Sequence, residues 1–202
     1  MNATTVSPAD QTANAGRPRD PRIDRAVLRA TAELLVEGGY ADLSIAAIAA
    51  RAGTTKPAIY RRWRSLAHLV HETAFPTGET TTLPETGSLA GDLREMVRRT
   101  VAVFSHPVAR AALPGLLAEV SADPSLHTAL LERFQDGVWG AIGARVAEAV
   151  ATGEARPGVD PGGLIETIGG ATMLALLVRP GGELDDTWVE HTADLLVNGV
   201  TP

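Results

Sequence analysis

The chain of 202 residues contains no cysteine. Disulfide bonds and thiolate metal sites are therefore excluded, and the composition suits the reducing cytoplasm, where we expect the protein to act. No uninterrupted run of about 18 apolar residues occurs, so we expect no membrane partner. Residues 1–16 lack the apolar core of a signal peptide and are small, polar and without periodicity. We expect a disordered tail there.

Catalytic and cofactor-binding signatures are also missing. No Ser-His-Asp grouping, phosphate-binding loop or paired-carboxylate motif can be placed. The second half of the chain lacks the Glu-x-x-His motif of ferritin-like helical enzymes. His68, His71 and Glu72 lie at helical spacing, but a metal site would need a further ligand from elsewhere. We therefore expect no enzyme activity, no cofactor and no metal.

The residues that are present predict an all-α protein. Alanine and leucine dominate, and β-branched residues seldom alternate with polar ones. Glycine and proline fall mainly between segments whose apolar residues recur at helical spacing. We predict about nine helices, with an N-terminal three-helix helix-turn-helix domain and a C-terminal helical bundle. The predicted helices span about 22–37, 45–52, 55–61, 66–75, 88–105, 107–121, 123–152, 160–178 and 185–199.

Charge and composition divide the chain into unequal parts. Residues 17–68 carry a net charge of +5, whereas residues 69–202 carry −10. Such asymmetry is expected when only one end of a protein meets phosphate. Between these parts lies a segment rich in threonine, proline and glycine. The predicted division is a tail at 1–16, a basic helix-turn-helix domain at 17–75, a linker at 76–87 and an acidic body at 88–202.

Residues 44–63 carry the strongest functional signal. They predict a short helix, a turn at Gly53 and a second short helix that ends in an aromatic and basic cluster, which is typical of a helix-turn-helix. The start of the second helix favours phosphate, and Tyr60 and Arg61 can reach phosphate or a guanine edge in the major groove. The predicted contacts to a double-stranded DNA operator are Ser44, Thr54, Thr55, Lys56, Pro57, Ala58, Tyr60, Arg61, Arg64 and Arg22.

Alternatives stay open for several of these positions. The arginines at 61–64 either contact phosphate or form a solvated charged face. The arginines at 17–22 either enter a minor groove or belong to a solubilising tail. Pro57 and Ala58 offer apolar contact, for example to a thymine methyl group. Trp63 is expected in the core that fixes the angle between the helices.

Over residues 22–70 the pattern resembles the TetR family of bacterial transcription regulators. One departure is Leu66, because the family usually has lysine at this position, and Arg64 or His68 would have to replace its phosphate contact. The rest of the chain is similar to one actinobacterial TetR subfamily at residues 86–93, 122–124 and 153–161. The matching residues of the first part are Ile23, Ala26, Ala32, Leu35, Gly39, Tyr40, Ser44, Ile45, Ile48, Ala49, Ala52, Gly53, Lys56, Ile59, Tyr60 and Trp63.

The resemblance implies a homodimeric DNA-binding regulator with a C-terminal unit for ligand binding and dimerisation. We predict a repressor that a small-molecule effector releases from a palindromic operator. The alternatives are an activator or a regulator without a ligand and, last, a helical enzyme.

The resemblance places the dimer interface on the last two helices. The segment 164–178 is apolar around most of its circumference and must be buried on more than one side. An ordinary monomer core is the alternative. The predicted interface residues are Ile168, Gly169, Thr172, Trp188, Leu195 and Leu196.

An apolar pocket for the effector is a further expectation, although each candidate taken alone is more simply explained as part of an ordinary core. The candidates are Phe104, His106, Leu113, Leu117, Phe134, Val138, Trp139, Ile142, Met173 and Leu177.

Overall fold

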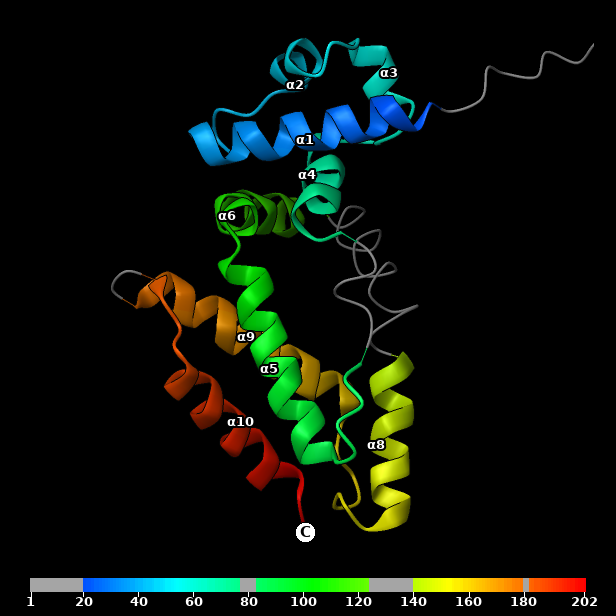
Figure 1. Cartoon of the computed structure of the whole chain (residues 1–202), viewed down its shortest axis with the longest axis vertical. Helices are drawn as coiled ribbons and strands as arrows, with labels where there is room; N and C mark the ends of the chain where they lie inside the picture. Colours follow the sequence, from blue (N-terminus) through cyan, green and yellow to red (C-terminus); the bar gives the residue numbers. More distant parts are fainter. Residues whose placement is uncertain (1–19, 77–82, 124–139, 180–181) are drawn as a thin grey trace, which may run out of the picture.

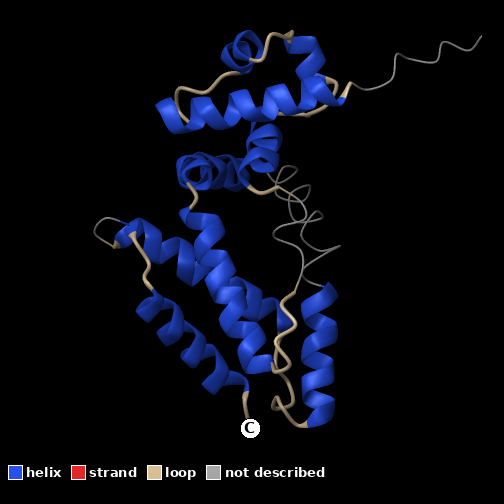
Figure 2. Ribbon diagram, viewed as in Figure 1, coloured by secondary structure: helices blue, strands red, loops and turns tan. Residues whose placement is uncertain are grey.

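The computed structural model describes residues 20–76, 83–123, 140–179 and 182–202. Within these ranges every element is a helix, so the all-α prediction is confirmed (Figures 1 and 2). We call α1–α4 the head and α5, α8, α9 and α10 the body. The elements are α1 Pro21–Gly38, α2 Ile45–Arg51, α3 Lys56–Tyr60, α4 Leu66–Ala74, α5 Leu89–Ser105, α6 Pro107–Ala122, α8 Gly140–Thr152, α9 Pro161–Val178 and α10 Asp186–Val200.

Capping residues set most helix starts where the sequence predicts them. Ser44, Thr55 and Ser65 each accept a hydrogen bond from the backbone N–H three residues later, at 3.2, 3.3 and 3.1 Å. Asp160 caps α9 in the same way, and Pro161 follows it at the first helical position, where a missing N–H costs nothing. Local side-chain chemistry therefore positions the short helices α2 and α3.

The predicted helix at 123–152 is only partly covered by the described residues. Its last part is α8, which ends at Thr152 before Gly153, whose φ is +76°. Phe134, Val138 and Trp139 lie outside the described residues, so their predicted place in a pocket remains a prediction. The tail at 1–16 and residues 77–82 of the linker lie outside them as well.

The described helices pack around two apolar cores. The first contains head residues such as Leu35, Ile48 and Ile59, together with four buried residues of α6. The second joins α5, α8, α9 and α10. Figure 1 shows α6 directly against α1 and α4, away from α8 and α10. Thus α6 follows α5 in sequence but packs as a fifth helix of the head. Its four buried residues are Val108, Ala109, Ala112 and Leu116.

A sharp bend joins the body to α6. The axes of α5 and α6 differ by 84°, and α6 begins at Pro107 after His106. His106 Nδ1 accepts a hydrogen bond from Val108 N at 3.4 Å, so this side chain caps α6. Beside the bend, Phe104 packs edge-on against Phe75 of the head, with ring centroids 5.8 Å apart. Any rotation at this bend would move the head relative to the body.

The turn between α1 and α2 docks on α6 at Gly115. A Cβ atom at Gly115 would lie 2.1 Å from Cγ of Tyr40, so only glycine permits this approach. The Tyr40 hydroxyl is buried. Burial, and then the carboxylate of Glu119 on α6, raise the pKa of Tyr40. The close fit fixes the head against α6.

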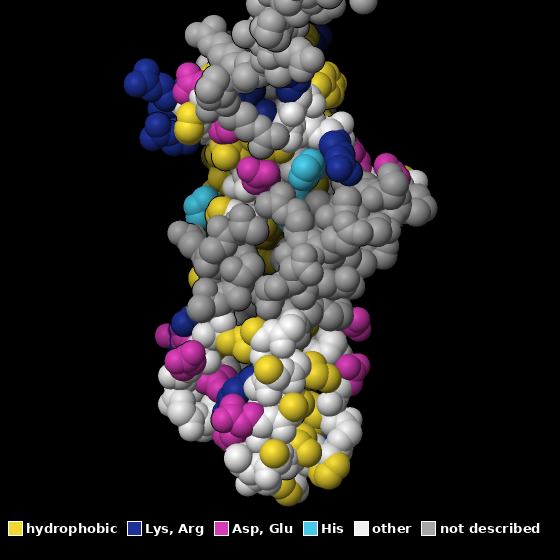
Figure 3. Space-filling view, turned by 90° about the vertical axis from the view of Figure 1, so that its right-hand side faces the viewer, with side chains coloured by type: hydrophobic (Ala, Val, Ile, Leu, Met, Phe, Trp, Pro, Cys, Tyr) yellow, Lys and Arg dark blue, Asp and Glu magenta, His cyan; other side chains and the backbone are white. Residues whose placement is uncertain are grey.

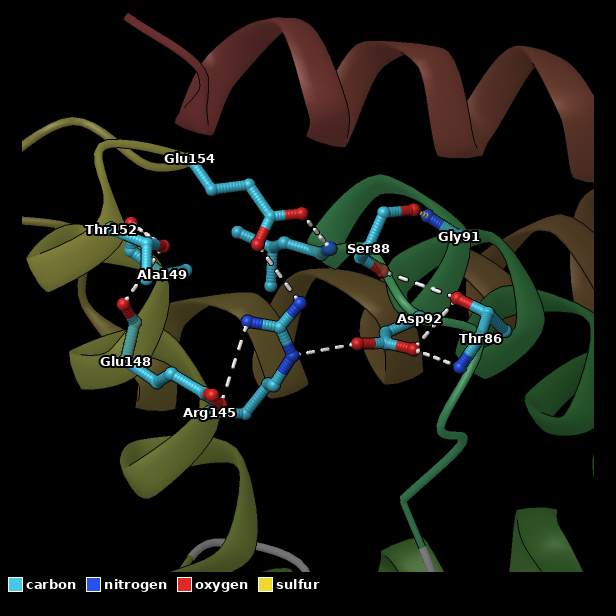
Figure 4. Close-up of polar contacts among 10 residues, drawn as sticks. Thr86, Ser88, Gly91, Asp92, Arg145, Glu148, Ala149, Thr152 and Glu154 are labelled. Carbon is cyan, nitrogen blue, oxygen red and sulfur yellow. Dashed lines mark hydrogen bonds and ion pairs between the residues drawn. The ribbon is translucent and has the colours of Figure 1, made fainter.

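A partly buried charged network ties the segment before α5 to α8 (Figure 4). Asp92 Oδ1 accepts hydrogen bonds from the backbone N–H and the hydroxyl of Thr86, both at 2.8 Å. Arg145 of α8 donates to Asp92 at 2.7 Å and to Glu154 at 3.0 Å, and Glu154 also accepts from Leu89 N. The body therefore begins before residue 88, inside the predicted linker.

Candidate nucleic-acid interface

α3 presents its polar and basic side chains to the surface. Tyr60 is 55% exposed, and Lys56, Pro57 and Arg61 are exposed beside it. Arg64 is exposed one turn beyond. Within α3, positions three or four residues apart share one face of the helix, so Pro57 and Tyr60 lie on one face, as do Lys56 and Tyr60. This face, with the exposed Arg61 and Arg64 that follow it, is polar and basic, as a surface that meets DNA phosphates requires. Ser44 and Thr55 are exposed next to it, and Thr54 is half-buried.

Ala58 does not belong to this surface. It is only 6% exposed and packs inward next to Ile59, which is fully buried. The prediction that Ala58 contacts DNA is therefore wrong, because the inward face of this short helix carries the residues that hold it to the head core. Pro57 keeps the exposed apolar position.

The three arginines after Tyr60 have different surroundings. Arg61 and Arg64 are exposed, whereas the side chain of Arg62 is 11% exposed and forms an ion pair with Asp24 of α1. Arg62 also donates a hydrogen bond to the carbonyl of Ala58 at 3.0 Å. Sequence reasoning treated the three as one group because spacing alone does not show which arginine points inward.

Two further arginines of the head lie at helix ends. Arg22 is exposed at the start of α1, where Asp20 caps the helix. Arg51 at the end of α2 forms a bidentate pair with Glu37, with both distances 2.8 Å. The hydrogen bond from Arg51 holds the pKa of Glu37 below its usual range. Arg51 therefore joins α2 to α1. On the face drawn in Figure 3, most Lys and Arg side chains gather at the head end of the molecule.

The remaining head residues singled out by the sequence are structural. Trp63 is 3% exposed, which confirms it as core, and its indole N–H donates to Glu72 at 3.1 Å. Leu66 packs partly buried against the same core. His71 is buried with its ring 5.4 Å from that of Phe75. Among the described residues, no group of three or more His, Asp or Glu side chains could hold a metal ion.

A second exposed surface lies on α9 and α10. α9 is long and apolar enough to cross a membrane by length and composition alone, a property that core helices of soluble proteins share, and 28% of its residues are buried. Leu174, Leu177, Val178 and Leu195 are 58–74% exposed. Of these four, Leu174, Val178 and Leu195 line an apolar groove of about 450 Å³. Its full lining is Thr167, Ala171, Leu174, Ala175, Val178, Arg179, Trp188, Thr192, Leu195 and Leu196.

This surface corrects the predicted dimer residues. Ile168 and Thr172 are 2% and 0% exposed and face the chain's own body, because they lie on the side of α9 that packs there. Their assignment to an outer interface is wrong. Trp188, Leu195 and Leu196 do line the groove, although Leu196 is only 8% exposed. A Cβ atom at Gly169 would meet nothing within 4 Å.

The predicted pocket residues that the structure describes lie in different surroundings. Leu117 and Leu177 are 37% and 58% exposed, and their place in a pocket remains a prediction. His106 is exposed and caps α6. Phe104 and Leu113 pack against the head core, and Ile142 is buried in the body core. Met173 is half-buried on α9.

The helical head with its exposed α3 defines a helix-turn-helix DNA-binding protein. Two family models match the chain: "Bacterial regulatory proteins, tetR family" over residues 27–73, and "Tetracyclin repressor-like, C-terminal domain" over residues 83–196. The chain belongs to the TetR family of transcription regulators, which confirms the prediction of a DNA-binding regulator rather than an enzyme.

Similar proteins support this assignment. An uncharacterised helix-turn-helix transcriptional regulator of Mycobacterium tuberculosis is 35% identical over 149 residues, covering 69% of this chain and 71% of the relative. The DNA-binding transcriptional repressor TetR of Mycobacteroides abscessus is 29% identical over 178 residues, covering 84% and 88%. A solved TetR family regulator is 28% identical with a TM-score of 0.65, covering 90% of this chain and 100% of that one.

Proposed function

We propose that the protein is a homodimeric repressor that binds a palindromic operator in the cytoplasm and leaves it when a small molecule binds. The observation that carries the proposal is the pairing of one exposed DNA-reading surface with one exposed apolar surface. Two copies joined by the apolar surface would present two α3 helices related by a two-fold axis. A palindromic site has the same symmetry.

The apolar surface supports a second copy of the chain as its occupant. Leu174, Val178 and Leu195 are exposed together along one groove, whereas scattered single exposed residues would need no explanation. In a two-fold dimer the same patch covers itself. The open space around Gly169 and Gly170 would let a neighbouring helix approach closely. The apolar circumference of α9 then has a partner on each side.

The position of α6 supports control by a ligand. α6 packs in the head core, while the helix before it, α5, packs in the body core. A ligand that binds the body more tightly in one arrangement of α5 and α6 would shift the two heads between spacings that fit and do not fit the operator. The relative in Mycobacteroides abscessus is a repressor, which favours repression over activation.

The proposal is tested by selecting DNA that the wild-type dimer retains from fragmented genomic DNA. Repression predicts sites that overlap promoters and contain inverted repeats, and transcription from them should fall when the protein is added. Tyr60→Ala should weaken binding to the selected site about 5- to 150-fold, the scale of about 1–3 kcal/mol for one base-reading contact. Sites without inverted repeats would contradict the dimer, and increased transcription would contradict repression.

The small-molecule step has its own test. Candidate compounds suggested by the genes beside the selected sites are added to the protein–DNA complex, and release is followed by anisotropy. If one compound releases the DNA and the release saturates as its concentration rises, the result supports a small-molecule effector. Operator occupancy that no compound changes would favour a regulator without a ligand.

A further inference from the structure

Arg62 is set apart from the neighbouring arginines by its contacts. Its side chain is 11% exposed, compared with 36% for its partner Asp24. The guanidinium donates through Nε to Asp24 on α1 and through Nη1 to the carbonyl of Ala58 on α3 at 3.0 Å. One side chain therefore joins the inner face of α3 to the first turn of α1.

The carbonyl of Ala58 needs such a donor because α3 is short. Where α3 ends, the backbone hydrogen bond spans three residues instead of four. Arg62 N donates to Ile59 O at 2.8 Å rather than to Ala58 O. The last carbonyls of a helix lack partners within the helix. The side chain of Arg62 supplies the hydrogen bond that its own backbone N–H does not, and the same guanidinium is held in place by Asp24.

We propose that Arg62 is a positioning residue for DNA recognition: with Asp24 it fixes α3 against α1, and it contacts no phosphate. A five-residue helix has few contacts of its own, and only Ala58 and Ile59 of α3 are buried. The Arg62–Asp24 pair adds a directional constraint to these two apolar contacts. The inference rests on α3 as the helix that reads DNA.

The two possible roles of Arg62 predict opposite signs for one substitution. If Arg62 served phosphate, Asp24→Asn would free the guanidinium and remove a negative charge from the basic head, so DNA binding would tighten. If Arg62 positions α3, Asp24→Asn removes the acceptor that holds it, and operator binding weakens. An estimate from net charge alone would therefore predict tighter operator binding for Asp24→Asn, whereas the positioning role predicts weaker binding.

The test uses the full-length protein with two duplexes of equal length, a selected operator and a scrambled sequence. Dissociation constants are measured by anisotropy between 50 and 200 mM salt. The variants are Arg62→Lys and Asp24→Asn, with Arg61→Gln as an exposed comparison. Arg51→Gln is the matched control, because the ion pairs of Arg51 with Glu33 and Glu37 join α2 to α1 and do not involve α3. Thermal melting confirms that each variant folds.

Positioning predicts that Arg62→Lys and Asp24→Asn each weaken operator binding about tenfold or more, while binding to scrambled DNA changes less than about twofold. The salt slope should stay at the wild-type value. Asp24→Asn combined with Arg62→Lys should be no worse than either alone, because both break one contact. Arg61→Gln, by contrast, should lower the slope by about 1 if it contacts phosphate.

Three results would overturn the proposal. If Asp24→Asn binds the operator as tightly as wild type, or more tightly, the proposal loses its basis. A salt slope lowered by about 1 in a further variant, Arg62→Gln, would place Arg62 on phosphate, because glutamine, unlike lysine, removes the charge. An equal loss of operator preference in Arg51→Gln would show that general loss of stability explains the effect. If Tyr60→Ala and Arg61→Gln leave operator binding unchanged, the assignment of α3 itself fails, and this inference fails with it.

Discussion

Asp92→Asn removes one charge from the buried network of the body while nearly keeping the shape of the side chain. Asp92 is 5% exposed and Arg145 is 19% exposed. Losing a hydrogen bond between charged groups costs about 1.5–3 kcal/mol, and leaving a buried charge without its partner costs about 3–5 kcal/mol. Arg145 keeps Glu154 at 3.0 Å, and asparagine still offers one oxygen to Thr86. We therefore expect the lower end, about 2 kcal/mol.

The assay is thermal unfolding of the full chain, followed by circular dichroism and calorimetry at pH 7. For a chain of this length, about 1 kcal/mol lowers Tm by about 2–4 °C, so Asp92→Asn should lower it by about 4–8 °C. Glu95→Gln is the control, because Glu95 pairs with Arg98 and Arg99 on the exposed side of α5. Such pairs contribute about 0–1 kcal/mol. Equal Tm values for Asp92→Asn and Glu95→Gln would refute the reasoning.

The comparison of wild type with Asp92→Asn also gives a prediction about pH. Burial alone would raise the pKa of Asp92, but hydrogen bonds from Thr86 and Arg145 outweigh it and hold the pKa below its ordinary value. A lowered pKa in the folded state gives stability that is present above the unfolded pKa of about 3.9 and is lost as pH falls through the folded pKa. The difference in Tm between wild type and Asp92→Asn should therefore shrink below about pH 4. A constant difference would show that charge is not its cause.

Two further substitutions test other surfaces. Leu195→Glu should convert the proposed dimer to a monomer, as measured by light scattering. Val36→Glu, at a 56% exposed site on the head, should stay dimeric. If both variants are dimers, the α9–α10 interface is refuted. Gly115→Ala should lower Tm by several degrees, since its Cβ would lie 2.1 Å from the Tyr40 ring, whereas Gly143→Ala, with nothing within 4 Å, should raise stability by about 0.5–1 kcal/mol. Adding Tyr40→Ala should recover part of the Gly115→Ala loss, and full stability of Gly115→Ala alone would refute the close contact.

Local chemistry made much of the head predictable. The starts of three helices are indicated by Ser44, Thr55 and Ser65, because a capping hydroxyl accepts a hydrogen bond from the backbone N–H three residues later. The exposed positions of Tyr60 and Arg61 follow from the same short-range geometry. The segments at 86–93 and 153–161, which resemble the actinobacterial subfamily, include Asp92 and Glu154. Both residues contact Arg145, but only folding of the body brings the three together.

Longer-range packing was not predictable in the same way. The spacing of apolar residues in α6 shows which side is buried but not what covers it, so its place in the head core was missed. α9 is apolar around most of its circumference, so its pattern could not distinguish Thr172, which faces the body, from Leu174, which faces outward. The inward turn of Arg62 depends on Asp24, thirty-eight residues earlier in the chain.

The packing of α6 means that the DNA-binding unit is not contiguous in sequence. Residues 20–76 alone would lack α6, which packs against α1 and α4, and would leave the Tyr40 ring without Gly115. A chimaera that exchanges only the first 76 residues with another family member would join two halves of one core that were never matched to each other. An exchange of DNA specificity between such regulators should therefore carry α6 together with α1–α4, with new junctions at the bend before Pro107 and after Ala122.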